Sequence, residues 1–389
     1  MKVKIRNIGV IVSGKLEEPI LKGDCLVLEN GKITFVGFEN DLDDKNFDKV
    51  IDANGNTVFP GLIDAHIHPV FGDYTPRQNT IGWISGYLHG GVTTMISAGE
   101  PHLPGRPRDV AGAKALAILA KKSFDKMRPG GVKVHAGAVI LEKGMTEDDF
   151  KELSQHGVWL VGEIGLGSVY KPEDARPLVQ LARKYGMKVK IHTGGTSIPG
   201  STTVGAEEVI AILPDVVGHI NGGPTAMPLE DAFRIVDETD IALEFVYCGN
   251  MKALQEIMKY IQKKNALGRV ILGTDSPSGT GIIPLGILRL LAFISSICEL
   301  EPEKVISLAT GNTARVYGLN TSVIEVGKEA DLVLADVPMG GVGENALDAL
   351  KNGDVPGISA VLIDGEVKVL KSKFTPPPSR MAEVTKGGN

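Results

Sequence analysis

Apolar runs and helical patterns alternate through most of the chain, from about residue 58 to residue 317. Each apolar run ends at a glycine-rich or polar break, and a segment with helical periodicity usually follows it. The apolar runs that predict strands are residues 58–67, 92–97, 132–140, 158–164, 187–192, 216–220, 241–247 and 269–273. The clearest helical patterns lie at residues 111–127, 172–185, 229–238 and 251–264.

This alternation predicts an α/β fold. Apolar runs that alternate with helices are typical of parallel strands buried on both faces of a sheet. Eight such units within about 260 residues match a (β/α)8 TIM barrel in number and in length. An open, doubly wound sheet is the alternative, but such a sheet usually has fewer units.

The two ends of the chain show a different pattern, in which short strands alternate with turns. Asn-Gly pairs at residues 30–31 and 54–55 are strong β-hairpin signals, and further strands are predicted at 331–335 and 361–363. We therefore expect a small β-sandwich domain built from both chain ends, residues 1–57 and 319–389, beside a barrel at 58–318. The tail after Lys373 contains three consecutive prolines and is expected to be extended or loosely ordered.

Composition excludes several classes of protein. The chain has 389 residues, of which 43% are hydrophobic and 23% charged, as in ordinary globular proteins. Its net charge of −6 offers no electrostatic reason to bind nucleic acid or an anionic membrane, and no apolar run approaches the length of a membrane span. The three cysteines, Cys25, Cys248 and Cys298, are too scattered for a disulfide framework, so we expect a reducing cytoplasmic location.

Histidines and carboxylates stand at the carboxyl ends of the predicted strands, where barrel active sites gather. His66 and His68 end the first predicted strand, and because they are two residues apart they share one face of it. The other strand-end candidates are Glu163 on the fourth strand, His192 on the fifth, His219 on the sixth and Asp275 on the eighth. Each residue alone could be an ordinary buried polar group. Together they would be costly to bury without a counter-charge, which metal ions supply.

Six such ligands fit two divalent ions better than one. His66, His68 and Asp275 are expected to hold one ion, and His192 and His219 the other. Glu163 and a hydroxide are expected to bridge the ions. Asp275 is also the candidate catalytic residue, because it can orient the hydroxide, accept its proton during attack on a carbonyl, and pass that proton to a leaving nitrogen.

These residues together resemble the amidohydrolase superfamily. The resemblance is carried by PGLIDAHIH at residues 60–68, by the histidines and aspartate at the ends of the fifth, sixth and eighth strands, and by GKEADLV at 327–333. Many binuclear members of that superfamily bridge their metals with a carboxylated lysine on the fourth strand. Residues 158–167 contain no lysine, and Glu163 stands in its place.

Longer segments, at residues 72–78, 89–95, 192–201, 219–226 and 276–281, resemble the enamidases of this superfamily. The resemblance implies hydrolysis of the ring amide of 1,4,5,6-tetrahydro-6-oxonicotinate to 2-formylglutarate and ammonia. It also implies one zinc and one iron ion per subunit and a homotetramer, although the ligands alone suit zinc, iron and manganese equally. Another cyclic amidase, lactamase or deaminase remains an alternative, as does a non-catalytic barrel scaffold.

A substrate carboxylate would need a partner on the same side of the barrel. Arg77 and Arg106 follow the first two strands and could each bind it with two parallel hydrogen bonds, although a salt bridge within the protein is as good an explanation. The glycine-rich loop at 194–200 could present the hydroxyls of Thr196 and Ser197 to the substrate. His102, in the loop after the second strand, could also line the pocket. The candidate substrate-binding residues are therefore Tyr74, Arg77, His102, Arg106, Thr196 and Ser197.

Overall fold

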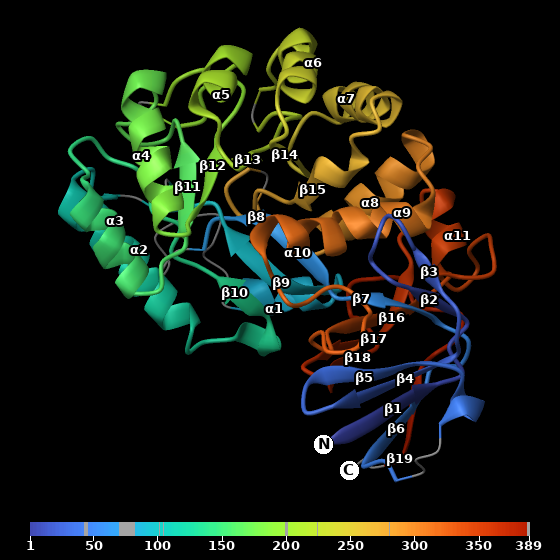
Figure 1. Cartoon of the computed structure of the whole chain (residues 1–389). Helices are drawn as coiled ribbons and strands as arrows, with labels where there is room; N and C mark the ends of the chain where they lie inside the picture. Colours follow the sequence, from blue (N-terminus) through green and yellow to red (C-terminus); the bar gives the residue numbers. More distant parts are fainter. Residues whose placement is uncertain are drawn as a thin grey trace.

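Two all-parallel sheets and two mixed sheets occupy separate parts of the molecule (Figure 1). The computed structural model describes residues 1–42, 46–69, 82–100, 102–103, 105–198, 201–223, 225–279 and 281–386. Among these residues, no helix combines the length and the apolar character that crossing a membrane requires. The predicted α/β fold class is confirmed.

The parallel strands form two sheets whose order follows the sequence. One sheet has the order β10-β9-β8 and the other has the order β11-β12-β13-β14-β15, and all of their pairings are parallel. Their bounds are β8 (Leu62–Ile67), β9 (Val92–Ser97), β10 (Lys133–His135), β11 (Leu160–Ile164), β12 (Lys188–Ile191), β13 (Val216–Val217), β14 (Ala242–Val246) and β15 (Val270–Gly273). Each strand lies within, or overlaps, one of the predicted apolar runs.

The two parallel sheets adjoin along both of their edges. At one edge, Val139 forms a parallel bridge with Val161. At the other edge, the backbone N–H of Asp275 donates to the carbonyl of His66 at 2.9 Å, and the N–H of His68 donates to Ser276 at 2.8 Å. These contacts place the carboxyl end of the last parallel strand directly beside that of the first.

Helices lie outside the parallel strands (Figure 1). The helices that follow the strands are α2 (Val110–Phe124), α3 (Glu147–Gln155), α4 (Pro172–Lys184), α5 (Ala206–Ile212), α6 (Leu229–Glu238), α7 (Met251–Lys263) and α8 (Gly286–Ile297). Shorter helices are α1 (Trp83–Leu88), α9 (Pro302–Leu308), α10 (Gly311–Tyr317) and α11 (Ala346–Lys351). Side-chain caps define several starts: Asp109 accepts a hydrogen bond from Gly112 N at the start of α2, and Asn250 caps α7 in the same way.

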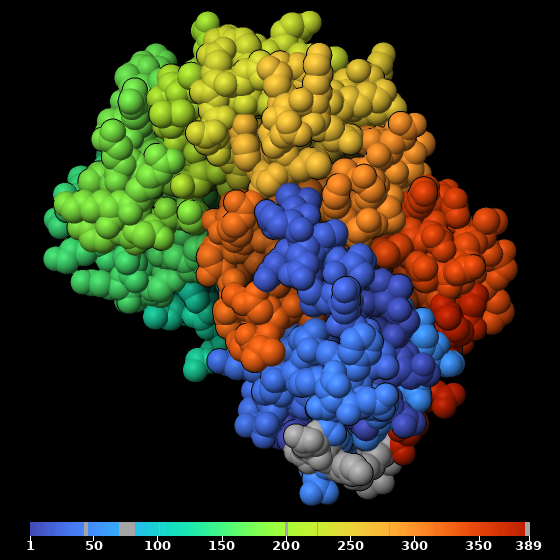
Figure 2. All heavy atoms as spheres, turned by 45° about the vertical axis from the view of Figure 1, so that its right-hand side comes forward, coloured from blue at the N-terminus to red at the C-terminus, as the bar shows by residue number. Residues whose placement is uncertain are grey.

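Both ends of the chain contribute strands to two further sheets. The sheet with order β19-β6-β1-β4-β5 contains β1 (Lys2–Arg6), β4 (Cys25–Glu29), β5 (Lys32–Gly37), β6 (Lys49–Asp52) and β19 (Glu383–Lys386). The sheet with order β18-β17-β16-β7-β2-β3 contains β2 (Val10–Val12), β3 (Ile20–Leu21), β7 (Thr57–Pro60), β16 (Leu332–Asp336), β17 (Gly357–Ile363) and β18 (Glu366–Leu370). Residues of both sheets, such as Ile5 and Leu362, share one hydrophobic core. This arrangement is consistent with a β-sandwich, and Figure 2 shows N-terminal segments (blue) beside C-terminal ones (orange and red).

The first predicted strand, residues 58–67, is in fact two strands in different sheets. β7 pairs with β2 and β16, whereas β8 pairs with β9. Gly61 separates them, and a Cβ at this position would lie 2.2 Å from Thr93 Oγ1, so the close packing requires glycine. The prediction of one continuous strand was wrong because the apolar pattern is the same on both sides of this glycine.

The two Asn-Gly pairs both form turns, but only one of these turns joins neighbouring strands of the same sheet. Asn30 and Gly31 have φ angles of 50° and 79° and join β4 to β5 in the predicted hairpin. Asn54 and Gly55 form a similar turn, with φ angles of 50° and 76°, but this turn links β6 to β7, which belong to different sheets. The hairpin prediction was therefore wrong at the second pair, where the turn carries the chain from one layer to the other.

The proline-containing tail is more regular than expected. Pro378 forms an antiparallel bridge with Pro338, and the N–H of Met339 donates to the carbonyl of Pro377 at 2.8 Å. Beyond the prolines, β19 pairs with β6 at the edge of its sheet. The expectation of a loosely ordered tail is therefore contradicted as far as residue 386.

One ion-pair cluster joins a parallel strand to the C-terminal strands. Lys133 on β10 places its Nζ 2.6 Å from Glu329 Oε2, 2.7 Å from Asp331 Oδ2 and 2.9 Å from Asp364 Oδ1. The three carboxylates lie close enough together to hold a cation, but the Lys133 ammonium already serves as their counter-charge.

His135 gives the fold an expected pH dependence. Burial and the nearby Lys121 lower the pKa of this histidine from 6.5 to about 4. In the unfolded chain this histidine takes up a proton near pH 6.5, whereas in the folded chain it does so only near pH 4. The free energy of unfolding therefore falls as the pH falls from about 6.5 toward 4. We expect the free energy of unfolding of His135→Gln, measured in urea, to fall less between about pH 7 and about pH 4.5 than that of the unaltered chain. His156→Gln, at an exposed helix end, is the control, and equal losses in both variants would contradict the prediction.

Candidate metal centre

The six predicted ligand residues lie together at the carboxyl ends of the parallel strands. They are His66 and His68 at the end of β8, Glu163 in β11, His192 after β12, His219 after β13 and Asp275 after β15. All are buried, and the most exposed of them, Asp275, is 6% exposed. Parallel strands bring their carboxyl ends to one rim, so residues far apart in sequence meet here.

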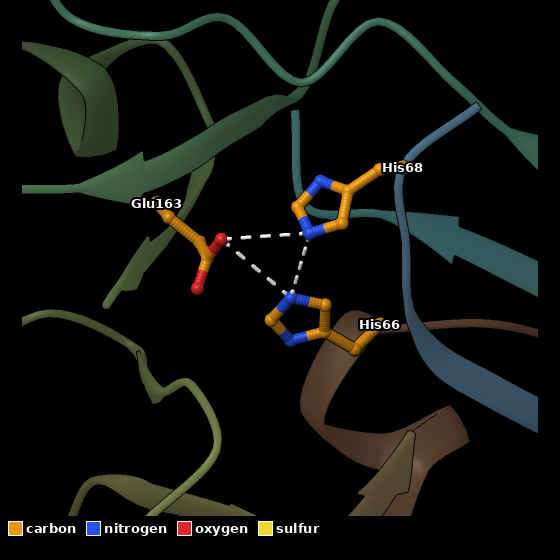
Figure 3. A group of neighbouring side chains, drawn as sticks. All are labelled: His66, His68 and Glu163. Carbon is orange, nitrogen blue, oxygen red and sulfur yellow. Dashed lines mark hydrogen bonds and ion pairs between the residues drawn. The ribbon is translucent and has the colours of Figure 1, made fainter. Parts of the chain in front are cut away.

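The Glu163 carboxylate lies between two pairs of histidines. His66 Nε2 and His68 Nε2 are 3.2 Å apart, and each lies 3.6 Å from Glu163 Oε2 (Figure 3). His192 Nδ1 and His219 Nε2 are 3.1 Å apart, and they lie 3.7 and 2.8 Å from Glu163 Oε1. Asp275 Oδ1 completes the first group, at 3.1 Å from His68 Nε2. The arrangement is consistent with a binuclear site.

The outward-facing ring nitrogens show which histidine atoms are available to a cation. The Nδ1 atom of His68 lies 2.8 Å from the carbonyl of Gly99, and the Nε2 atom of His192 lies 2.9 Å from the carbonyl of Gly195. Because a carbonyl only accepts, each of these nitrogens carries a proton, so the opposite nitrogen of each ring is the one that faces the site and can offer a lone pair to a cation. Two ring nitrogens about 3 Å apart, such as those of His66 and His68, need a proton or a metal ion between them, so this donor set fits a metal.

The electrostatics of the site also favour positive charge. Burial alone would lower the pKa of His66, but the carboxylates of Glu244 and Glu163 outweigh it and raise the pKa to about 10. Burial would raise the pKa of Asp275, yet its interactions with His68 and His66 hold it well below its usual value. In addition, the buried His219 Nδ1 has no hydrogen-bond partner among the described residues.

Two residues behind the candidate ligands, Glu244 and Lys190, orient His66, and neither was predicted from the sequence. Glu244 Oε2 accepts a hydrogen bond from His66 Nδ1 at 2.6 Å, and Lys190 Nζ donates to Glu244 Oε1 at 2.6 Å and to the carbonyl of Ala65 at 2.7 Å. Glu244 is fully buried and Lys190 is 3% exposed. The spacing of Lys190 and His192, two residues apart on one strand, was the available signal that Lys190 faces the interior.

Asp64 ties the first and last parallel strands together beneath the ligands. Its Oδ1 accepts from Thr274 N at 2.9 Å, and its Oδ2 accepts from Thr274 Oγ1 at 2.6 Å. Burial raises the pKa of Asp64 to about 6. Since His66 and Asp275 are close neighbours of these two residues in the chain, this link fixes the spacing of the strand ends that carry them.

Two of the six candidate ligand residues have unusual backbone conformations. His219 has a φ of 36° and Asp275 has a φ of 61°, both in the left-handed region that disfavours side chains. Hydrogen bonds hold Asp275 there: its N–H donates to His66 and its carbonyl accepts from Gly279 N at 2.8 Å. Strain of this kind persists only where the surroundings impose it, and it is typical of functional positions.

A cavity of about 400 Å³ opens above the ligands. Its described lining consists of His102, Glu163, His192, Ser197, His219, Gly223, Cys248, Asp275, Ser278 and Gly279. Ser278 Oγ is buried and has no hydrogen-bond partner among the described residues, which leaves it available to a bound molecule. Cys248 Sγ lies 2.9 Å from Asp275 Oδ2, and burial together with that carboxylate raises the pKa of the thiol.

Apart from Arg106, the predicted substrate-binding residues divide into three groups. His102 and Ser197 line the cavity. Thr196 is exposed and is not among the described lining residues. Tyr74 and Arg77 lie outside the described residues.

Arg106 occupies a different place from the one expected. Its Nη1 donates to Glu142 Oε1 at 3.0 Å and its Nη2 donates to the carbonyl of Leu166 at 3.1 Å. The Arg106 side chain is 5% exposed and is not part of the described cavity lining. Its carboxylate partner comes from within the protein, 36 residues away along the chain, which is the internal salt bridge that the sequence also allowed for Arg106.

Comparisons with known proteins identify relatives that align with most of the chain. The chain is 57% identical over 383 residues to the enamidase of Eubacterium barkeri, covering 98% of this chain and 99% of that protein. It is 23% identical over 384 residues to the imidazolonepropionase of a Geobacillus species, covering 84% and 87% of the two chains.

Solved structures are similar as well. The crystal structure of an enamidase, described as a new member of the amidohydrolase superfamily, has a TM-score of 0.96 at 56% identity and covers 99% of this chain and 100% of its own. A β-aspartyl dipeptidase from Fervidobacterium islandicum has a TM-score of 0.66 at 19% identity, covers 96% and 97% of the two chains, and supports the fold alone. The model of the amidohydrolase family matches residues 57–368, and this chain belongs to that family.

Proposed function

We propose that this protein is a binuclear, metal-dependent cyclic amidohydrolase that opens the ring amide of 1,4,5,6-tetrahydro-6-oxonicotinate. The observation that carries the proposal is the position of Glu163, whose two oxygens face separate histidine pairs beside Asp275. The 57% identity with an enamidase supports the choice of substrate. The first water breaks the ring C–N bond, and a second water releases ammonia from the enamine, which leaves 2-formylglutarate.

We further propose that the parallel strands close into one eight-stranded barrel within residues 58–318. The contacts along both edges of the two parallel sheets support closure. Residues 1–57 and 319–389 would then form the second domain, the β-sandwich. A homotetramer in the cytoplasm, suggested by the likeness to enamidases, completes the proposed organisation.

The ligand groups suggest how two ions are shared. His66, His68 and Asp275 would hold one ion, and His192 and His219 the other, with Glu163 between them, as the pairwise distances suggest. Zinc and iron are the proposed pair. When bound, two divalent ions lower the pKa of water toward neutrality and polarise an amide carbonyl.

Asp275 is the proposed proton carrier. Its Oδ1 faces His68, whereas its Oδ2 lies toward the thiol of Cys248 in the cavity wall. Because its pKa is held low, the carboxylate is ionised at neutral pH and can accept the proton of the attacking water. It then passes that proton to the ring nitrogen as the C–N bond breaks.

The cavity wall would bind the rest of the substrate. Its volume lies within the usual range for small-molecule sites. Ser197, Ser278 and His102 are the described side chains that can bond to a ring carboxylate or carbonyl. No lysine or arginine is among the described lining residues, so Arg77, with Tyr74, remains the predicted partner for the substrate carboxylate.

Incubating the purified protein with the tetrahydro-oxonicotinate tests this function. We expect stoichiometric ammonia release, about two metal ions per chain by elemental analysis, and loss of turnover after chelation that added metal restores. A lactam of the same ring size without the carboxylate is the control and is expected to react far more slowly. Bound metal without ammonia release would refute the substrate, and full turnover by metal-free protein would refute the metal centre.

A further inference from the structure

A thiol contacts the proposed proton carrier inside the cavity. Cys248 follows β14, and its Sγ lies 2.9 Å from Asp275 Oδ2, within hydrogen-bonding distance for a thiol. Both residues line the cavity. Nothing in the metal-ligand arrangement requires a cysteine here, because the six predicted ligands are histidines and carboxylates.

The two oxygens of Asp275 have different surroundings. Oδ1 lies 3.1 Å from His68 Nε2 and 3.6 Å from His66 Nε2, so it faces the ligand cluster. Among the described residues, the hydrogen bond to Oδ2 comes from the Cys248 thiol. Because the two oxygens are chemically equivalent, a half-turn about χ2 restores the same arrangement, so the thiol contact opposes intermediate rotations and fixes the plane of the carboxylate.

Packing holds the thiol in place against Asp275. A Cβ on Gly279 would lie 2.4 Å from Cys248 Sγ, so glycine is needed for the loop to pass the sulfur this closely. The N–H of Gly279 donates to the carbonyl of Asp275 at 2.8 Å. The same short loop therefore positions both the backbone of Asp275 and the sulfur that contacts its side chain.

We propose that Cys248 is a positioning residue for Asp275, whose thiol fixes the carboxylate plane so that one oxygen faces the candidate ligand histidines and the other faces the cavity wall. A thiol suits both states of a proton carrier, because S–H donates to the ionised carboxylate and sulfur accepts weakly from the protonated one. This inference rests on the proposed function of Asp275 and deepens it, since it names the side chain that orients the proposed proton carrier.

The first experiment separates positioning from simple packing. In Cys248→Ala we expect kcat to fall about 10-fold to 100-fold, with KM and metal content nearly unchanged, because a misdirected carboxylate slows proton transfer without weakening binding. Cys248→Ser, which keeps a donor on a shorter bond, is expected to recover kcat to within about five-fold. Cys298→Ala is the matched control and should leave kcat unchanged, because Cys298 is buried at the end of α8, outside the described cavity lining. A Cys248→Ala kcat within about two-fold of the parent would overturn the proposal.

The second experiment needs no turnover. A Cys25→Ala/Cys298→Ala chain retains a single thiol, whose infrared S–H stretching band moves to lower frequency when the thiol donates a hydrogen bond. We expect Asp275→Ala to shift this band to higher frequency, and Asp275→Asn, a weaker acceptor that preserves the shape of the site, to shift it less. An unchanged band in both variants would refute the contact. If the band shifts although the parent protein releases no ammonia, the contact stands and the proposed substrate fails.

Discussion

Asp275→Asn is expected to lower kcat by about 10²- to 10⁴-fold while the protein remains folded. Asparagine has the shape of aspartate and can still accept a hydrogen bond from Cys248, but it cannot take up a proton from water. The main effect should therefore fall on the chemical step. Turnover is measured by ammonia release, and metal content is measured on the same samples.

Asp148→Asn provides the control for this substitution. Asp148 lies exposed in α3, outside the described cavity lining, and its replacement should leave kcat unchanged. Loss of metal from Asp275→Asn would show that the carboxylate acts mainly as a ligand. A variant that keeps its metal and more than about a tenth of the activity would contradict the proton-carrier role.

Breaking the Lys190–Glu244 ion pair is expected to have the largest effect on stability. Lys190→Met leaves the buried Glu244 carboxylate with His66 alone, and removing one partner of a buried pair costs about 3–5 kcal/mol of unfolding free energy. Glu244→Gln instead weakens the acceptor that orients His66, and we expect metal affinity to fall about 10- to 100-fold. Denaturant unfolding and metal competition measure the two effects separately.

The double variant distinguishes an unpaired charge from lost packing. Lys190→Met/Glu244→Gln contains no unpaired charge, so it should be more stable than Lys190→Met alone. Lys188→Met is the matched control on the same strand; its ammonium is 3.9 Å from Asp215 in a half-exposed pair, worth about 0–1 kcal/mol. If the double variant is as unstable as Lys190→Met, packing and not charge explains the loss.

The positions of the six candidate ligands could be predicted because local rules determine them. Alternation of side chains along a strand places His66 and His68 on one face, and parallel topology brings the strand ends to one rim. Glu163 at the end of the fourth strand followed from the same rule. No partner had to be known in advance for these residues, only the position of each strand end.

The remaining features depend on partners that a pattern does not identify. Glu142 pairs with Arg106 across 36 residues, and Glu244 meets His66 across 178, so neither contact has a local signal. The break at Gly61 depends on Thr93, which packs against it from β9. The C-terminal strand β19 forms by pairing with β6 at the edge of its sheet, a partner more than 300 residues earlier in the chain.

Gly61 has a consequence for how the protein can be altered. It is the single residue between β7, which is hydrogen-bonded within the six-stranded sheet, and β8, which ends at the first ligand pair. With so short a connection, a shift of the six-stranded sheet displaces the imidazoles of His66 and His68 as well. Substitutions selected only to stabilise that sheet should therefore also change metal retention and turnover, although they lie far from the cavity and touch none of its residues.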